Sequence, residues 1–225
     1  MCACVAKRRK QLMFTGQSAC GIYNIPRLDV LEMRPHCISE KSKGSDIIRW
    51  HHGVPDTNAK IINDFLVAGP IRAICDLAKY DSATSLMVSI NHCLYRKLFS
   101  FEEFLSELID RHGMKNRNTL RRLLWFANEK CASPLETIAW IAIHNAGFVL
   151  PQHQIDIYDK HHFIGCVDMY WELSNRNLVL ELDGKVKYKT GDDLLAEKRR
   201  EDQLRRMNIE VFRASWNDVK NGKLV

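Results

Sequence analysis

Two carboxylates at alternate positions of one expected strand are the residues of this sequence best placed to do chemistry. Glu181 and Asp183 lie in the segment 178–183, separated only by Leu182. Side chains two residues apart in a strand point to the same face, so these two acids would lie side by side. Like charges this close oppose each other's ionisation, and a divalent cation would neutralise them. Asp168, in the preceding expected strand, would complete the site.

The chemistry expected of these acids is hydrolysis of a phosphodiester with the help of bound Mg²⁺ or Mn²⁺. Mg²⁺ takes one or two carboxylates and keeps several waters, which leaves room for a phosphate group. Such an ion holds the phosphate, activates a water molecule and stabilises the leaving oxygen. The structural alternatives are a turn at Asp183, which a glycine follows, and a buried, hydrogen-bonded role for Asp168. Glu181 would then form an ion pair with Lys185 or Lys198.

The sequence around these acids predicts an α/β unit, a mixed sheet flanked by helices. A helix is expected to begin at Ser133-Pro-Leu-Glu136 and to end before Gly147. Glu136 has two roles open to it: a partner in the helix cap, and a further acid that faces the sheet. The remaining elements are expected strands at 154–158, 163–171 and 178–183, a charged helix at 192–207 and a strand at 209–214.

The charged helix carries three basic candidates for contacts with a nucleic-acid backbone, Arg199, Arg200 and Arg205. The alternative is a solvated face on which acids and bases four residues apart form ion pairs.

Residues 1–130 are expected to form an α+β region that is mostly helical. Helices are predicted over 15–23, from Pro70, from Asp81, from the capping box at Ser100 and over 119–128, and strand-like stretches at 29–33 and 46–51. In the helix over 119–128, Arg121 and Arg122 lie near Trp125, so both nucleic-acid contact and simple solvation are open. A boundary near residue 130 separates this region from the α/β domain at 131–225.

Composition is that of a folded protein: 46% of the 225 residues are hydrophobic, 27% are charged and the net charge is +6. This basic bias is compatible with a polyanionic partner such as DNA. No apolar run approaches the ~20 residues of a membrane helix, so we expect no membrane association. The eight cysteines form no CxxC pair, and we expect reduced core thiols of a cytoplasmic protein. The histidine pair at 51–52 is expected in a turn or at the surface.

Four blocks of the C-terminal region resemble the DUF559 family. They are SPLE at 133–136, GCVDMYW at 165–171, VLELDGKVKY at 179–188 and AEKRREDQLR at 196–205. That family is similar to the very-short-patch mismatch-repair endonucleases and belongs to the PD-(D/E)XK nuclease superfamily. The resemblance implies a Mg²⁺-dependent DNA endonuclease in which Asp168 and Glu181 bind the metal. Glu136 would be an accessory acid, and the Leu182 carbonyl a possible further ligand.

The sequence departs from the superfamily pattern at one catalytic position. The residue two after Glu181 is normally a lysine, and here it is Asp183. The resemblance then implies that Lys185 or Lys187 supplies the catalytic cation from a shifted position; Lys185 is the candidate for this role, and Lys187 is a candidate contact to DNA.

The upstream blocks FTGQSA at 14–19 and VAGPIRAICDLA at 67–78 resemble the middle region of bacterial AbiEi-type antitoxin-like proteins. The winged helix that precedes this region in longer relatives is expected to be absent. This resemblance implies an alternative function, a non-catalytic DNA-binding or regulatory protein with a toxin or phage-defence partner. The oligomeric state stays open.

Overall fold

The computed structural model describes residues 12–40, 46–111, 114–183 and 191–222, which form two mixed sheets and eight helices. The α/β class expected from the sequence is confirmed. The chain divides into two compact units, Met1–Glu129 and Lys130–Val225, and the expected boundary lies one residue from this division.

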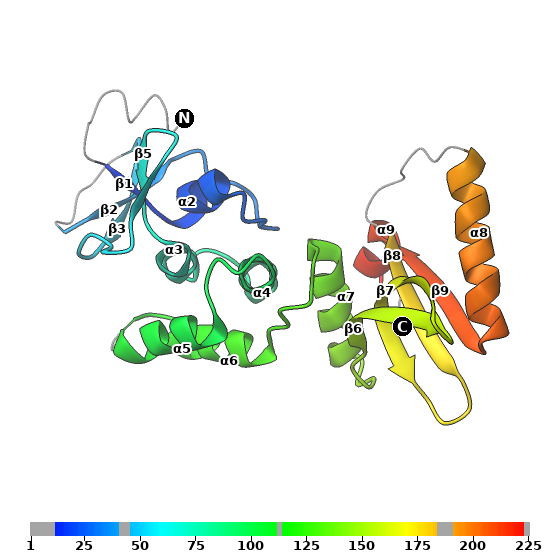
Figure 1. The fold of residues 1–225 in the computed structure, drawn as a ribbon. Helices are drawn as coiled ribbons and strands as arrows, with labels where there is room; N and C mark the ends of the chain where they lie inside the picture. Colours follow the sequence, from blue (N-terminus) through cyan, green and yellow to red (C-terminus); the bar gives the residue numbers. More distant parts are fainter. Residues whose placement is uncertain (1–11, 41–45, 112–113, 184–190, 223–225) are drawn as a thin grey trace. The chain divides into compact units, whose positions relative to one another are not determined.

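The N-terminal unit contains a five-stranded sheet in the order β3-β2-β1-β5-β4 (Figure 1). Its strands are β1 (Met13–Phe14), β2 (His36–Ser39), β3 (Arg49–His52), β4 (Lys60–Ile62) and β5 (Phe65–Val67). The β1–β5 and β2–β3 pairs are parallel, whereas β1–β2 and β4–β5 are antiparallel. Only β3 coincides with an expected strand.

The strand expected at 29–33 is wrong, and the side chain of Gln17 explains the difference. Its amide nitrogen donates to the Glu32 carbonyl at 2.7 Å, and its amide oxygen accepts the Glu32 N–H at 2.9 Å. A single side chain therefore satisfies the backbone groups that a neighbouring strand would otherwise pair. The segment stays irregular, although its residues have the character of a strand.

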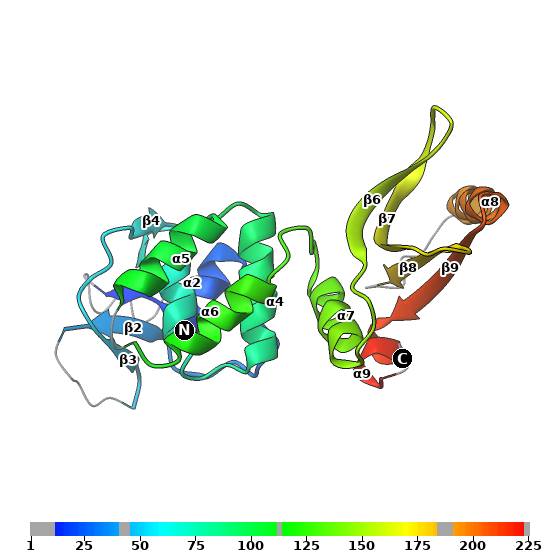
Figure 2. The ribbon, with the colours of Figure 1, turned by 90° about the horizontal axis from the view of Figure 1, so that it is seen from below.

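Five helices complete the N-terminal unit, and each confirms a helix expected from the sequence. They are α2 (Gly16–Tyr23), α3 (Pro70–Leu77), α4 (Ala83–Tyr95), α5 (Phe101–Asp110) and α6 (Arg117–Phe126). Caps fix two of the starts, because Ser82 accepts the Ser85 N–H and Ser100 forms a capping box with Glu103. In Figure 1, helices α5 and α6 lie farthest from the sheet, and Figure 2 shows the unit from their side.

A buried polar cluster ties the sheet of the N-terminal unit to α3. The Asp76 carboxylate accepts hydrogen bonds from Thr15 Oγ1 at 2.7 Å and from Arg72 Nε at 2.8 Å. His51 Nδ1 lies 3.6 Å from the same carboxylate, and His51 Nε2 lies 2.9 Å from His36 Nδ1. The placement of His51 in a turn or at the surface is therefore wrong. Burial, with the charge of His51, lowers the pKa of His36 to about 4.

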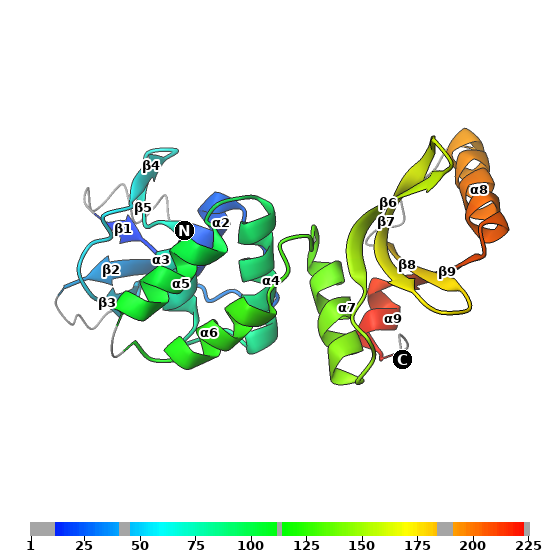
Figure 3. The same cartoon turned by 60° about the horizontal axis from the view of Figure 1, so that its bottom comes forward.

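The C-terminal unit is built on a four-stranded sheet in the order β6-β7-β8-β9. The strands are β6 (Gln152–Asp159), β7 (His162–Glu172), β8 (Asn177–Asp183) and β9 (Ile209–Ser215), and the helices are α7 (Pro134–Asn145), α8 (Gly191–Arg206) and α9 (Trp216–Lys220). Within this sheet, the β8–β9 pair is parallel and the other pairs are antiparallel. Helices α7 and α8 flank opposite faces of the sheet, and α9 lies beside α7 (Figures 1 and 3).

Local sequence accounts for these boundaries. Ser133 caps α7 by accepting the Glu136 N–H, Pro134 occupies the first helical position, and Gly147 follows the helix with a φ of 78°. Of the expected helices and strands in this unit, none is missing. The short helix α9 was not expected, although Ser215 and Asp218 form its capping box.

Two further expectations concern cysteines and membranes. The described cysteines are buried except for Cys166, which is exposed and corrects its expected place in the core. Within the described residues, no helix has the length and apolar character needed to cross a membrane.

Replacing Gly16 by alanine should destabilise the N-terminal unit. Gly16 has a φ of 50°, and an added Cβ would lie 2.7 Å from His36 Nδ1. We expect a loss of about 1–3 kcal/mol in the free energy of unfolding, measured by urea denaturation. Gly21→Ala in the same helix is the matched control, because no atom lies within 4 Å of its added Cβ. Equal stability of the two variants would contradict the strained packing at Gly16.

Candidate functional site

Neighbouring strands bring Asp168 and Glu181 together. Strands β7 and β8 are antiparallel, and their last paired residues are Met169 and Leu180. One step further along the same register, Asp168 lies opposite Glu181. Residues opposite each other in an antiparallel pair point to the same face. The pair of acids singled out from strand periodicity is therefore side by side.

The carboxylate of Asp168 is held by two N–H donors. Its Oδ2 accepts the backbone N–H of Leu182 at 2.8 Å, and its Oδ1 accepts the side-chain amide of Gln154 at 3.2 Å. The bond to Leu182 ties the acid of one strand to the backbone of the next. The orientation of Asp168 is therefore set by the sheet itself.

Gln154 connects two of the acids. Its amide nitrogen donates to Asp168 and also to Glu136 Oε2, in both cases at 3.2 Å. The backbone of Gln154 has a φ of 51°, a left-handed conformation that is uncommon for a residue with a side chain. It lies in β6 between His153 and Ile155, which pair with β7, while Gln154 itself does not appear in the pairing. Unusual backbone at such a position is typical of functional sites.

Glu136 serves both of the roles that the sequence left open. Its backbone N–H donates to Ser133 in the cap of α7, while its carboxylate accepts the Ala132 N–H at 3.0 Å and the amide of Gln154. The side chain is buried. Burial raises the pKa of Glu136, and the negative charge of Asp168 raises it further, against the hydrogen bonds that it accepts.

Glu181 forms an ion pair with Arg200 of α8. Of the two lysines expected as alternative partners, Lys198 is exposed, and Lys185 lies outside the described residues. Burial raises the pKa of Glu181, the Arg200 charge opposes this shift, and the charge of Asp168 adds to it. A carboxylate in this environment gains from a positively charged partner.

Arg200 reaches Glu181 by crossing β7 at Gly165. Its guanidinium donates to the Cys166 carbonyl at 3.3 Å, and a Cβ on Gly165 would lie only 2.8 Å from Arg200 Nη1. The glycine thus leaves the space that the arginine occupies. Of the three arginines expected to contact a phosphate backbone, Arg200 faces the acids instead.

The other two candidate arginines lie on the outside of α8. Arg199 is exposed. Arg205 pairs with Glu201 at 2.6 Å, an exposed i,i+4 ion pair of the kind expected for a solvated face. In β9, Arg213 lies opposite Glu181 in the register and forms ion pairs with Glu197 and Glu201 of α8.

Asp183 ends β8 as an exposed residue opposite Ser215 of β9. Asp183 is therefore more exposed to solvent than the half-buried Asp168 and Glu181. Lys185 and Lys187 lie outside the described residues. The cations that reach the acids within the described ranges are arginines, Arg200 at Glu181 and, through its longer-range charge, Arg213.

Glu136, Asp168 and Glu181 lie close together in this site, and N–H groups of neighbouring side chains donate hydrogen bonds to their carboxylates. In the described parts of the chain, no three His, Cys, Asp or Glu side chains are grouped closely enough to hold a metal ion. The donors of Gln154 and Arg200 instead occupy the oxygens of Glu136, Asp168 and Glu181. The Gln154 amide and the Arg200 guanidinium thus hold the acids near one another. They contact the carboxylate oxygens that a metal ion would otherwise bind.

Gln154 was not identified as a site residue from the sequence, and the contact of Arg200 with Glu181 was not foreseen. The role of Gln154 depends on the pairing of β6 with β7, in which His153 faces Met169 and Ile155 faces Val167. In this hairpin register, the position of Gln154 corresponds to that of Asp168. The contact between Arg200 and Glu181 leaves no comparable local signal, because it joins a helix to a strand of the sheet beneath it.

Comparison with models of protein families, with curated proteins and with solved structures finds no match for this chain.

The elevated pKa of Glu136 should make the free protein less stable as the pH rises. A carboxyl whose pKa is raised on folding favours the folded state below its unfolded pKa and loses that advantage as pH rises through the folded pKa. Glu136→Gln removes this charge and keeps an acceptor for Ala132 and Gln154. We expect it to stabilise the protein at pH 8 by about 0.5–2 kcal/mol, and much less at pH 4, in thermal unfolding with EDTA.

Glu172→Gln provides the control, because Glu172 is an exposed acid of the same unit. A Glu136→Gln variant whose stability relative to wild type is the same at both pH values would show that Glu136 carries no such cost.

Proposed function

We propose that the C-terminal unit is a Mg²⁺-dependent DNA endonuclease of the PD-(D/E)XK type. The observation that carries this proposal is the convergence of Asp168 and Glu181 on adjacent antiparallel strands, with Glu136 linked to them through Gln154. The order of elements supports it: a helix, three antiparallel strands, a second helix, and a strand parallel to the third. It is the order that the sequence pattern of this unit predicts.

The residues present fit Mg²⁺ in the type of donor. Asp168 and Glu181 supply two carboxylates, and the carbonyl of Leu182, the residue after Glu181, is a further oxygen. Mg²⁺ prefers oxygen ligands and is usually bound through one or two carboxylates. The raised pKa of Glu181 also indicates an acid whose ionised form gains from positive charge. When bound, Mg²⁺ supplies Lewis-acid polarisation of a phosphate oxygen and lowers the pKa of a water molecule.

The protein's own residues hold this site in order. The Leu182 N–H and the Gln154 amide fix the orientation of Asp168, and Gln154 also holds Glu136 close to it. Arg200 neutralises Glu181 in the free protein, and in the proposed function it moves from that acid to a phosphate of the DNA. Guanidinium groups suit both partners, because carboxylates and phosphates present similar pairs of oxygens.

Contacts to DNA are proposed for the basic residues around α8. Arg199 is exposed and available, whereas Arg205 would have to exchange Glu201 for a phosphate. Lys185 and Lys187 are proposed as the catalytic cation and as a DNA contact, respectively. We propose a cytoplasmic location, because buried cysteines used as small core residues are typical of proteins in a reducing compartment.

The second candidate function is a non-catalytic DNA-binding regulator with a toxin or phage-defence partner. One observation favours it: Asp183 takes the position of the usual lysine, and Glu181 is already neutralised by Arg200. A site closed in this way would keep the fold and the affinity for DNA without turnover.

Removing either proposed metal-binding acid should abolish binding of Mn²⁺. We expect calorimetric titration to show binding to the wild type and at least ~100-fold weaker binding to Asp168→Asn and Glu181→Gln, with cleavage of plasmid DNA lost in parallel. Asp202→Asn, an exposed acid of α8, is the matched control. Binding and cleavage by both acid variants at the wild-type level would reject the assignment. Metal binding without cleavage would favour the regulator.

Restoring a lysine at position 183 should increase cleavage. Asp183 is exposed at the end of β8, so Asp183→Lys brings little cost in packing. The new ammonium group would stand at the position that the superfamily pattern assigns to the catalytic cation. We expect the rate of plasmid cleavage to rise by about tenfold or more, within the range of a single charged catalytic group. Asp183→Asn separates this effect from simple removal of a negative charge, and equal rates for both variants would argue against a role for a cation there.

A further inference from the structure

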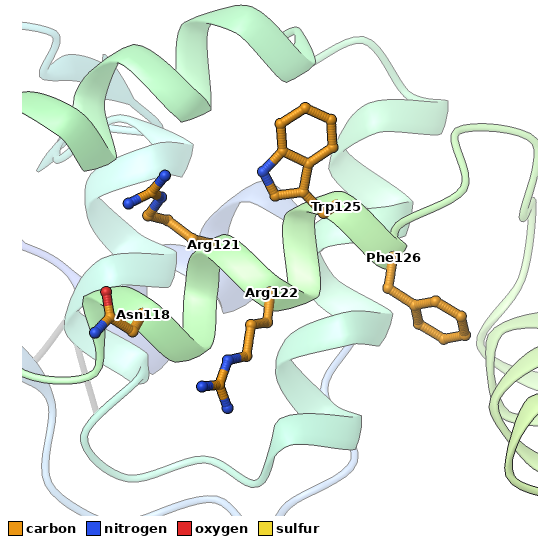
Figure 4. A pocket seen from close by; sticks show the side chains of 5 residues that line it. All are labelled: Asn118, Arg121, Arg122, Trp125 and Phe126. Atoms are coloured by element: carbon orange, nitrogen blue, oxygen red, sulfur yellow. The ribbon is translucent and has the colours of Figure 1, made fainter.

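Helix α6 has an exposed basic and aromatic surface that the proposed nuclease chemistry does not use. The segment 114–128 contains four lysine and arginine residues and no aspartate or glutamate. A shallow depression of about 470 Å³ lies on the outer side of the helix (Figure 4). We call this the α6 surface, and its residues are Asn118, Arg121, Arg122, Trp125 and Phe126.

The core of the N-terminal unit does not require the exposed side chains of this helix. Leu120 and Leu124 form its inner face, and both are fully buried. Trp125 is on the other side and is 67% exposed, although its ring meets Phe101 edge to face at 5.0 Å. The contact with Phe101 holds one edge of the indole and leaves most of its surface to solvent. Large exposed aromatic groups of this kind are typical of binding surfaces.

The two arginines of the α6 surface carry uncompensated charge. Among the residues that the structure describes, no acid forms an ion pair with Arg121 or Arg122. Arg121 and Trp125 are four residues apart, so their side chains rise from the same side of the helix (Figure 4). Arg122 projects on the other side of the depression. Positive charge therefore lies on both sides of the depression, and the ring of Trp125 lies on the side of Arg121.

We propose that the α6 surface binds single-stranded DNA, with Arg121 and Arg122 on phosphates and Trp125 stacked on a base. Guanidinium groups pair with phosphate oxygens, and an aromatic ring stacks on a base of any sequence. Stacking on an exposed ring requires a base that is free of its partner, which selects a single strand over a duplex. The shallow form of the depression suits a strand that lies across the helix.

This inference stands apart from the proposed cleavage site. The α6 surface belongs to the N-terminal unit, and the proposed metal-binding acids belong to the C-terminal one. Asp168→Asn should therefore abolish cleavage and leave binding to the α6 surface unchanged. Cleavage tests the proposed nuclease site and binding of single-stranded DNA tests the α6 surface, so either proposal can fail while the other holds.

Binding of the full chain to a labelled oligothymidylate, followed by fluorescence anisotropy in EDTA, tests the inference. Trp125→Ala should weaken binding by about tenfold or more, the range for loss of one stacked base. The double variant Arg121→Gln/Arg122→Gln should reduce the slope of log K against log salt by about 1.4, which is ~0.7 for each lost phosphate contact. Tyr95→Ala and Lys60→Gln, at exposed positions of the same unit, should bind as the wild type does.

Folding is checked separately by circular dichroism, and Trp125→Phe provides a variant that keeps an aromatic ring and should retain most of the affinity. Binding that is unchanged in Trp125→Ala would overturn the inference, whatever the effect of the arginines. It would also be overturned if duplex DNA or a polyglutamate peptide competed as well as the single strand, because the surface would then attract polyanions or an acidic protein without stacking.

Discussion

The negative charge of Asp168 is the constraint around which the C-terminal unit is arranged. Burial raises the pKa values of Glu136 and Glu181, and the negative charge of Asp168 raises both of them further. Three carboxylates from a helix and two strands would not stay together without compensation. The Gln154 amide and the Arg200 guanidinium provide it, and the backbone N–H of Leu182 fixes the central acid. The folded unit therefore keeps a concentration of negative charge ready for a positive partner.

The part of this arrangement that could be predicted from the sequence is the part that depends on local periodicity. Alternation along β7 and β8 placed Asp168 and Glu181 on strands that would present them together, and caps such as Ser133 located the helices. The neutralising groups could not be found in this way. Gln154 requires the register of a hairpin and a left-handed backbone at one residue, and Arg200 requires knowledge of which turn of α8 lies over the acids.

The N-terminal unit shows the same limit more strongly. Its strands have two to four residues, which is too short for an alternation of apolar and polar side chains to be recognised. Its central polar contacts join β3 and β2 to α3, so that His51, His36 and Asp76 meet from distant parts of the sequence. His51, which was expected in a turn or at the surface, is buried because its partners His36 and Asp76 come from other parts of the sequence. Helices, whose signals are local, were found without this information.

The absence of a side chain at Gly165 limits which substitutions this unit can accept at that position. Arg200 passes through the space above that glycine, so any larger residue there would push the guanidinium away from Glu181. Loss of the arginine, in turn, would leave the space empty and the acid without its cation. A side chain at position 165 would therefore require Arg200 to shift, and loss of Arg200 would remove the ion-pair partner of Glu181. A residue with no functional group thus shares in the constraint placed on a charged one far along the chain.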